Sequence, residues 1–209
     1  MIRLCVDPHS PDPALLARAA AVIEAGGLVA LPTDTLYGLA VNPFDAAAVQ
    51  RVFLVKGRPA DFPLPLVAAD LNQVRSTVGP LPAMAEALAA RFWPGPLTLL
   101  VPAPQALPRD LTAGTSRVGI RVPAHAVPRK LCEACGSLLT ATSANPSGQA
   151  ATGDPGVVAA TLGRHLDVLV DAGRTSGGLA STIVDATGPA PRLVRVGAVA
   201  WEHVLECLK

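Results

Sequence analysis

The chain has 209 residues, of which 50% are hydrophobic, 16% charged and 3% aromatic, and its formal net charge is +1. This length predicts a single domain over residues 1–209 with a large core. The near-neutral charge and the scarcity of aromatic rings argue against nucleic-acid binding by bulk charge or base stacking. No apolar run reaches the roughly 18 residues of a membrane span, and the N-terminus lacks a signal-peptide pattern, so we expect a cytoplasmic protein with no membrane partner.

The first half of the chain predicts helices and short buried strands in irregular alternation. Apolar residues at helical spacing precede Gly26-Gly27, and Asp45 before a run of alanines is good N-cap chemistry. The expected helices are Ala14–Ala25, a helix from Asp45 to about Leu54, and Pro82–Phe92. The expected strands are Leu28–Leu31, Leu39–Val41, Leu64–Ala69, in which Pro65 indicates an edge or a bulge, and Leu97–Val101. Residues 33–38, 56–59 and 93–96 are expected to be turns or loops.

The second half continues this pattern. The expected strands are Val118–Val122, Leu138–Thr142, Leu166–Val170, Ser181–Asp185 and Leu193–Val196, and the expected helices are Ala126–Cys135 and Val199–Leu208. Residues 103–116 are the most loop-like stretch and the best candidate for a mobile segment. The irregular alternation favours an α/β fold with a twisted, mixed parallel and antiparallel sheet.

Two polar stretches lie between segments that are otherwise typical of buried core. Lys56-Gly57-Arg58 places an ammonium and a planar guanidinium two residues apart, and both groups suit phosphate or carboxylate. Ser143-Ala144-Asn145 follows a predicted buried strand and supplies short hydrogen-bonding side chains. Together they predict a site for a polar, polyanionic small molecule such as a nucleoside triphosphate. Neither a Rossmann nor a P-loop glycine motif occurs in the chain.

Further polar side chains fall at, or just beyond, the ends of predicted strands. Strand ends that meet at one edge of a sheet commonly form a ligand crevice, so we expect a shared site, although an isolated arginine at a strand end is ordinarily a surface residue. The residues are Thr33, Thr35, Arg121, Ser143, Asn145, Ser181, Thr182 and Arg195.

The four cysteines are too few to indicate a disulfide scaffold in a chain of this length. Cys132 and Cys135 form a single CxxC, which is compatible with a metal half-site or a redox pair. No second CxxC and no nearby histidine pair completes a zinc set, and the motif falls in a helical pattern where both cysteines share a face. We therefore expect structural cysteines and no protein-ligated metal.

Six short motifs occur in order along most of the chain. They are Pro32-Thr33-Asp34-Thr35-Leu36-Tyr37-Gly38-Leu39, Lys56-Gly57-Arg58-Pro59, Pro94-Gly95-Pro96-Leu97-Thr98, Gly119-Ile120-Arg121-Val122-Pro123, Thr142-Ser143-Ala144-Asn145 and Ser181-Thr182-Ile183-Val184-Asp185. In this combination the sequence closely resembles the YrdC-like family, the L-threonylcarbamoyladenylate synthases, over roughly residues 14–197. The resemblance implies a twisted mixed α/β sheet with flanking helices around a large concave cavity, here in the short, single-domain form.

The resemblance also implies a reaction. ATP, L-threonine and bicarbonate would give threonylcarbamoyl-AMP and pyrophosphate, and a separate complex would move the threonylcarbamoyl group to an adenosine next to the anticodon of tRNA. The threonine amine would attack bicarbonate or its dehydrated form, and the resulting carbamate oxygen would attack the α-phosphate. Mg²⁺ is expected with ATP because it bridges triphosphate oxygens in most nucleotidyl transfers, whereas no carboxylate pair suggests a dedicated metal cage.

Matched position by position, the resemblance implies roles for the polar residues of the motifs. Lys56 and Arg58 would hold triphosphate oxygens and stabilise charge at the α-phosphate, which makes them the catalytic candidates. Arg121, together with Arg58, would pair with the threonine carboxylate. The implied ATP site comprises Lys56, Arg58, Ser143, Asn145 and Arg195, and the implied threonine site comprises Thr33, Thr35, Arg121, Ser143 and Ser181.

One position departs from the family pattern. Many members have a histidine a few residues after the Lys-x-Arg motif, where this chain has Val67. Valine cannot make the polar contact to threonine that histidine would make, so we expect the affinity and selectivity for threonine to be affected.

Two other functions stay open on this sequence. The first is a module that binds double-stranded RNA or tRNA, for which the near-neutral charge predicts only weak binding. The second is a related carbamoyl-adenylate-forming domain, as in hydrogenase-maturation carbamoyltransferases. The acylphosphatase-like domain and zinc-finger motifs that accompany that domain do not occur in this sequence.

Overall fold

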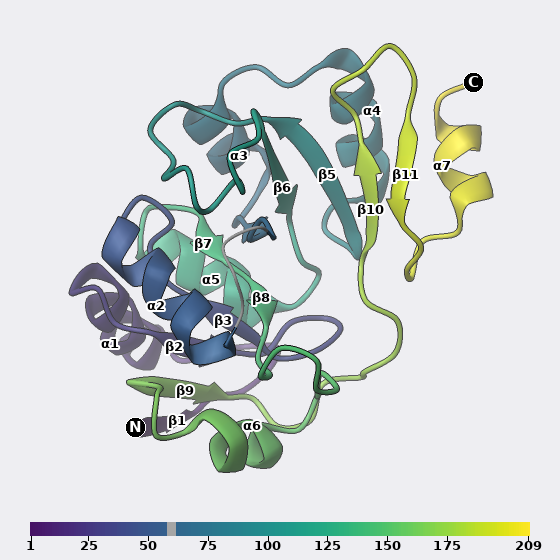
Figure 1. Cartoon of the computed structure of the whole chain (residues 1–209). Coiled ribbons are helices and arrows are strands. Elements are labelled where there is room, and N and C mark those ends of the chain that lie inside the picture. The colour runs from purple at the N-terminus through teal and green to yellow at the C-terminus, as the bar shows by residue number, and fades with distance from the viewer. Residues whose placement is uncertain (58–61) are drawn as a thin grey trace.

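The computed structural model describes residues 1–57 and 62–209, and within them the strands form two mixed sheets (Figure 1). The five-stranded sheet has the order β1 (Ile2–Cys5), β9 (Val168–Asp171), β2 (Val29–Leu31), β3 (Gly38–Ala40) and β8 (Thr142–Ser143). The six-stranded sheet has the order β11 (Arg192–Arg195), β10 (Thr182–Asp185), β5 (Leu97–Pro102), β6 (Arg117–Arg121), β4 (Leu66–Val67) and β7 (Leu139–Thr140). The predicted mixed α/β fold is confirmed, with the strands divided between two sheets.

Both sheets combine parallel and antiparallel pairs. In the five-stranded sheet, β9 lies between β1 and β2 and is parallel to both, while β3 is antiparallel to β2 and β8. In the six-stranded sheet, β10 is parallel to β5 and β4 is parallel to β6. The other three pairs, β10–β11, β5–β6 and β4–β7, are antiparallel.

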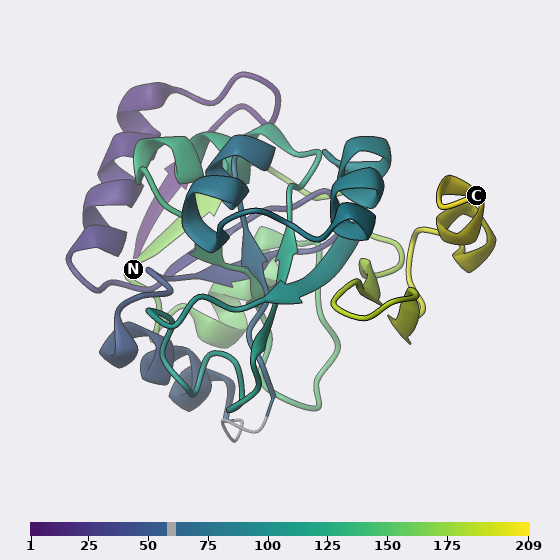
Figure 2. The same ribbon diagram turned by 90° about the horizontal axis from the view of Figure 1, so that it is seen from above.

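The helices of the described residues lie around the two sheets (Figures 1 and 2). They are α1 (Pro13–Glu24), α2 (Ala46–Lys56), α3 (Leu71–Val78), α4 (Ala83–Phe92), α5 (Ala126–Ala134), α6 (Pro155–Leu162) and α7 (Trp201–Cys207). Helix α1 packs on α5, and α4 packs on α7. None of these helices is long and apolar enough to cross a membrane.

Aspartate N-caps begin four of the helices, because the side-chain oxygen accepts a hydrogen bond from an N–H that has no partner inside the helix. Asp45 accepts from Ala47 N and Ala48 N, which confirms the predicted cap of α2. Asp12, Asp70 and Asp154 begin α1, α3 and α6 in the same way. Helices α3 and α6 and strand β1 were absent from the predicted elements, although the Asp-Pro at the start of α6 is a sequence signal for a helix N-terminus.

Three predicted boundaries differ from the structure in ways that matter for the site. Helix α2 continues to Lys56 and ends at Gly57, which has φ 59°, so Lys56 is the last helical residue and does not lie in a loop. Strand β4 keeps only two residues of the predicted Leu64–Ala69, since Pro65 cannot donate to a sheet ladder. The predicted strand Leu138–Thr142 is divided at Ala141, where the chain leaves the six-stranded sheet and enters the five-stranded one.

Two clusters of buried apolar residues form the core. One contains most of the six-stranded sheet with α2, α4 and α7, and the other contains α1, α5 and the strands of the five-stranded sheet next to them. Residues 103–116 form a series of turns, and Leu107 and Leu111 within this stretch are buried. Leu64 N donates a hydrogen bond to Leu111 O at 2.9 Å. The mobility of this stretch stays a prediction.

Candidate active site

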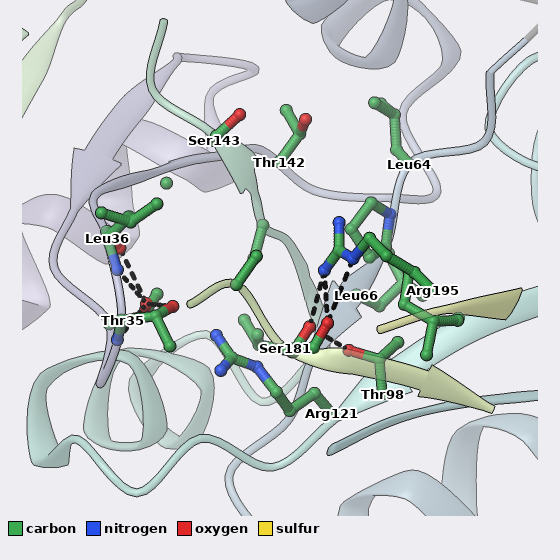
Figure 3. A pocket seen from close by; sticks show the side chains of 18 of the residues that line it. Thr35, Leu36, Leu64, Leu66, Thr98, Arg121, Thr142, Ser143, Ser181 and Arg195 are labelled. Carbon is green, nitrogen blue, oxygen red and sulfur yellow. Dashed lines mark hydrogen bonds between the residues drawn. The ribbon is translucent and has the colours of Figure 1, made fainter. Parts of the chain in front are cut away.

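A cavity of about 400 Å³ draws its walls from both sheets (Figure 3). Six of the predicted site residues line it: Thr33, Thr35, Arg121, Ser143, Ser181 and Arg195. Thr98 and Thr142 add two hydroxyl groups that the sequence analysis had assigned no role, and no carboxylate occurs among the described lining residues. The remaining wall is largely apolar and includes Val67, which is fully buried and so supplies no polar group where many relatives are expected to have histidine.

The turn after β2 fixes the first pair of hydroxyl groups. Thr33 Oγ1 accepts hydrogen bonds from Thr35 N and Leu36 N, both at 3.2 Å, and donates to Leu36 O at 2.7 Å. Thr33 and Thr35 Oγ1 are 3.1 Å apart. Thr33 is thus fixed to the backbone of its own turn through one donated and two accepted hydrogen bonds. Thr35 Oγ1 has no other described side-chain partner than Thr33, so it can exchange a hydrogen bond with a ligand in the cavity.

Arg121 is the last residue of β6, and its side chain is 8% exposed. Its Nη1 donates to Asp34 Oδ1 at 2.9 Å, and Asp34 Oδ2 accepts from Ala124 N at 3.3 Å. Burial lowers the pKa of the Arg121 guanidinium, while the charge of Asp34 and its hydrogen bond oppose that effect. The guanidinium stays charged, because the pKa of arginine is far above neutral.

Arg195 ends β11 on the other side of the cavity and holds Ser181. Its Nη2 donates to Ser181 O at 2.7 Å and to Ser181 Oγ at 3.0 Å. Ser181 Oγ also lies 2.8 Å from Thr98 Oγ1, so a row of Arg195, Ser181 and Thr98 side chains borders the cavity (Figure 3). Burial lowers the pKa of Arg195, and the positive charge of Arg121 lowers it further. The two guanidinium groups therefore repel each other, and an anion between them would relieve that repulsion.

Lys56 and Asn145 lie behind Ser143 and are not part of the cavity lining. Lys56 is 3% exposed, and its Nζ contacts Ser143 O at 2.5 Å, Asn145 O at 2.9 Å and Asn145 Oδ1 at 3.3 Å. The amide nitrogen of Asn145 donates to Gln149 O at 2.6 Å and Pro146 O at 3.1 Å. The described contacts of Lys56 therefore fix the backbone that presents Ser143 to the cavity.

Arg58, the second catalytic candidate, lies outside the described residues. Its assignment to the triphosphate and to the threonine carboxylate stays a prediction. Thr182, which the sequence analysis placed among the strand-end residues, is fully buried, and its Oγ1 donates to Val199 O at 2.6 Å. It therefore anchors the segment before α7 and does not line the cavity.

The connection from β9 to β10 passes from one sheet to the other and is tied to the turn at residues 33–37. Thr175 Oγ1 donates to Thr35 O at 2.7 Å, and Ser176 Oγ donates to Asp34 O at 3.1 Å. Tyr37 OH donates to Gly173 O at 2.7 Å, and burial raises its pKa. These side-chain contacts to backbone had no sequence signal, because they join residues more than 130 positions apart.

The cysteine pair lies at the C-terminal end of α5, and neither cysteine lines the cavity. Cys132 is fully buried and its Sγ is 3.4 Å from Val67 O, while Cys135 follows the last helical residue. Burial raises the pKa of both thiols, that of Cys135 to about 11. Within residues 1–57 and 62–209, no group of three or more His, Cys, Asp or Glu side chains is placed to hold a metal ion.

Known proteins are similar to this chain in sequence and in fold. A family model named Sua5_yciO_yrdC, described as "Telomere recombination", matches residues 21–197. A threonylcarbamoyl-AMP synthase of Pyrococcus abyssi is 41% identical over 186 residues, which are 89% of this chain and 55% of that protein. One of Bacillus subtilis is 38% identical over 95% of this chain and 58% of its own length, so the chain spans little more than half of these two relatives. A putative threonylcarbamoyl-AMP synthase of Mycobacterium tuberculosis is 36% identical over 98% of this chain and 93% of its own length.

Solved structures agree with these relatives. Sua5 of P. abyssi, crystallised with L-threonine, matches with a TM-score of 0.94 and 38% identity over 100% of this chain and 61% of its own. YciO of Escherichia coli matches with a TM-score of 0.86 and 25% identity over 96% of this chain and 98% of its own. The family model covers far more than half of the sequence, and the fold agrees over nearly all of it. The chain therefore belongs to the Sua5–YciO–YrdC family.

Proposed function

We propose that this chain is a threonylcarbamoyl-AMP synthase, which converts ATP, L-threonine and bicarbonate into threonylcarbamoyl-AMP and pyrophosphate. The observation that carries the proposal is the cavity itself. Two guanidinium groups, the buried one of Arg121 and the more exposed one of Arg195, face a set of serine and threonine hydroxyls with no carboxylate among the described lining residues. Such a cavity suits an anionic substrate that is also rich in hydrogen-bonding groups. The names of the relatives support the choice of reaction.

Threonine would bind at the end of the cavity formed by the turn after β2 and the end of β6. The Arg121 guanidinium would pair with the threonine carboxylate, since arginine presents several donors in a plane. Thr35 lines the cavity, and its Oγ1 would accept a hydrogen bond from the threonine amine. Thr33, Ser143 and Ser181 complete the proposed amino-acid site.

ATP would occupy the side of the cavity next to Ser143 and Arg195. Arg195 and Arg58 would contact phosphate oxygens, and Asn145 would support the loop that meets the nucleotide. Lys56 would act by its buried positive charge and by holding Ser143 in place. Mg²⁺ would enter with the triphosphate and keep most of its water, since the described lining offers it hydroxyl and carbonyl oxygens only.

The chemistry needs two bond-forming steps. The threonine nitrogen attacks the carbon of bicarbonate, whose hydroxyl group takes the amine proton and leaves as water, or the carbon of carbon dioxide, in which case the amine releases its proton to solvent. Either route gives a carbamate. A carbamate oxygen then attacks the α-phosphorus of ATP, and pyrophosphate leaves with the electron pair of the broken P–O bond. The fixed positive charges stabilise the additional negative charge on the phosphate oxygens, so catalysis consists of positioning and charge neutralisation. The product would then serve a separate complex that modifies tRNA.

The direct test measures pyrophosphate release from ATP with and without threonine and bicarbonate. We expect release to require both, and we expect valine to fail and serine to work partly. A site that hydrogen-bonds a hydroxyl can reject an analogue without it by roughly 10⁴-fold, whereas a missing methyl group is worth only about 1–3 kcal/mol. Because Val67 supplies no polar contact, the preference over serine is expected to be the smaller of the two. Release that ignores threonine, or equal affinity for threonine and valine, would contradict the proposal.

A further inference from the structure

Asp34 has no role in the function proposed so far, although it is the partner of the central arginine. Its side chain is 14% exposed and its two oxygens accept from two different groups. Oδ1 accepts from Arg121 Nη1 at 2.9 Å, and Oδ2 accepts from Ala124 N at 3.3 Å. Ala124 follows β6 by three residues, so Asp34 is itself fixed to the segment that carries Arg121.

The ion pair engages only one end of the guanidinium. Among the described residues, Asp34 is the only one that accepts a hydrogen bond from Arg121, and it does so through Nη1 alone. A two-point contact would have used two of the five N–H groups in parallel. The single contact leaves Nε and Nη2 for another acceptor, and the guanidinium lies beside Thr35 in the cavity (Figure 3).

The positive charges beside the cavity are only partly neutralised by the protein itself. Arg121 and Arg195 bring two positive charges that repel each other, and Asp34 neutralises one of them. The described lining contains no carboxylate of its own. A ligand with one carboxylate would neutralise the remaining positive charge. Its carboxylate can reach Arg121 only if that side chain is held where its unused donors face the cavity.

We propose that Asp34 is a positioning residue of the amino-acid site, which holds Arg121 by one end so that its other donors bind the substrate carboxylate. This inference rests on the proposed function. A purely structural ion pair would have a different consequence, because its loss would lower stability without changing how well the protein distinguishes a carboxylate from a neutral group. A positioning role predicts that loss of Asp34 weakens the discrimination between a carboxylate and a neutral group.

The test compares L-threonine with L-threoninamide, which replaces the carboxylate by a neutral amide. Dissociation constants are measured by calorimetry in the presence of a non-hydrolysable ATP analogue, for the unmodified protein, Asp34→Asn and Glu86→Gln. The asparagine side chain of the first variant can still accept from Ala124 N but presents no charge to Arg121. Glu86→Gln is the matched control. Glu86 on α4 forms an ion pair with Arg75 on α3, and neither residue lines the cavity.

We expect the unmodified protein and Glu86→Gln to prefer threonine over threoninamide by about tenfold or more, which corresponds to one charge-assisted contact. Asp34→Asn should reduce that preference to about threefold or less. Its Michaelis constant for ATP should stay within about twofold of the unmodified value, because the nucleotide contacts lie elsewhere. An Asp34→Asn protein with the full preference overturns the positioning role.

Failure of this inference can be told from failure of the proposed function. If the unmodified protein releases pyrophosphate only with threonine, and Asp34→Asn keeps its preference for the carboxylate, the function stands and the positioning role is overturned. If the unmodified protein shows no dependence on threonine, both are overturned. Should Asp34→Asn not fold, Asp34→Glu moves the carboxylate by one methylene and should still lower the preference several-fold, and an unchanged preference in that variant counts against the role.

Discussion

Lys56 and Arg121 are both buried cations next to the same cavity, and their surroundings differ in one respect. The ammonium of Lys56 contacts backbone and side-chain oxygens of Ser143 and Asn145, whereas Arg121 has a single described partner at one end. A lysine carries three N–H donors, so the contacts to the 143–145 segment occupy them, while arginine carries five. A buried positive charge can thus shape a site or bind its ligand, and the number of N–H donors that its neighbours leave unused separates the two roles.

The largest effect is expected for Lys56→Ala. Pyrophosphate release should fall by about 10²- to 10³-fold, the usual cost of removing one preorganised charge. The free energy of unfolding should also fall by roughly 1–3 kcal/mol, because the carbonyl oxygens of Ser143 and Asn145 lose their donor. Steady-state turnover and urea unfolding measure the two quantities, with the exposed Lys130→Ala as control. Near-normal turnover in a folded Lys56→Ala protein would remove Lys56 from the site.

Arg121→Lys should separate binding from stability. The lysine keeps a positive charge for Asp34 but loses the planar set of donors, so the KM for threonine should rise about 10- to 100-fold. The KM for ATP and the free energy of unfolding should change little. Arg117→Lys is the matched control, since Arg117 pairs with Asp185 outside the cavity. An equal rise in the KM values for threonine and ATP would mean that Arg121 contributes to binding both substrates. The distinction between the roles of Arg121 and Lys56 would then be wrong.

A smaller effect is expected for Ser181→Ala. The hydroxyl accepts from Arg195 Nη2 and lies 2.8 Å from Thr98 Oγ1, so its loss frees both neighbours without removing a charge. One neutral hydrogen bond is worth roughly 1 kcal/mol, which predicts a fall in kcat/KM of about fivefold. Steady-state kinetics with threonine as the varied substrate measure it, and Ser76→Ala on exposed α3 provides the control. A loss as large as that of Lys56→Ala would show that Ser181 takes part in the chemical step.

The smallest effect on activity is expected for Cys132→Ser and Cys135→Ser. Both thiols have pKa values raised by burial and so stay protonated near neutral pH, where metal binding and nucleophilic attack need the thiolate. Turnover should stay within about twofold of the unmodified value, because neither residue is part of the described cavity lining. Elemental analysis of the purified protein provides the second measurement. Stoichiometric zinc that disappears together with activity in Cys132→Ser would refute the structural assignment.

Much of the cavity was predictable because its residues lie at or near the ends of short apolar strands. Thr33 follows a predicted strand by two residues, Arg121 lies near the end of one and Ser181 begins one, and the structure brings them to one cavity. Periodicity alone could not show that the Lys56 ammonium contacts the backbone oxygen of Ser143, since that contact joins residues 87 positions apart. The position of Arg58 relative to the cavity stays a prediction.

The fold shows the same division between local and distant signals. A glycine stop predicted the end of α1 and an aspartate cap predicted the start of α2, because these signals lie next to the helix they delimit. The division of the predicted strand at Ala141 had no such signal, since the β-branched Thr140 and Thr142 on its two sides suit a strand in either sheet. The partner of Arg121 could not be read from the sequence for a similar reason: Asp34 lies in a turn motif whose aspartate is equally suited to capping or to hydrogen bonding with its own backbone.

The place of β9 inside the five-stranded sheet bears on how the chain folds. β1 and β2 are made first, but both pair with β9, so Ile2 meets Val168 and Val29 meets the same residue. Ile2 and Val29 must therefore wait for Val168, which is synthesised much later than either of them. Contacts of such long sequence separation slow folding, and they leave edges of the early strands unpaired in the meantime. The sheet next to Thr33 and Thr35 consequently gains its full set of strand pairs only after β9 has been synthesised.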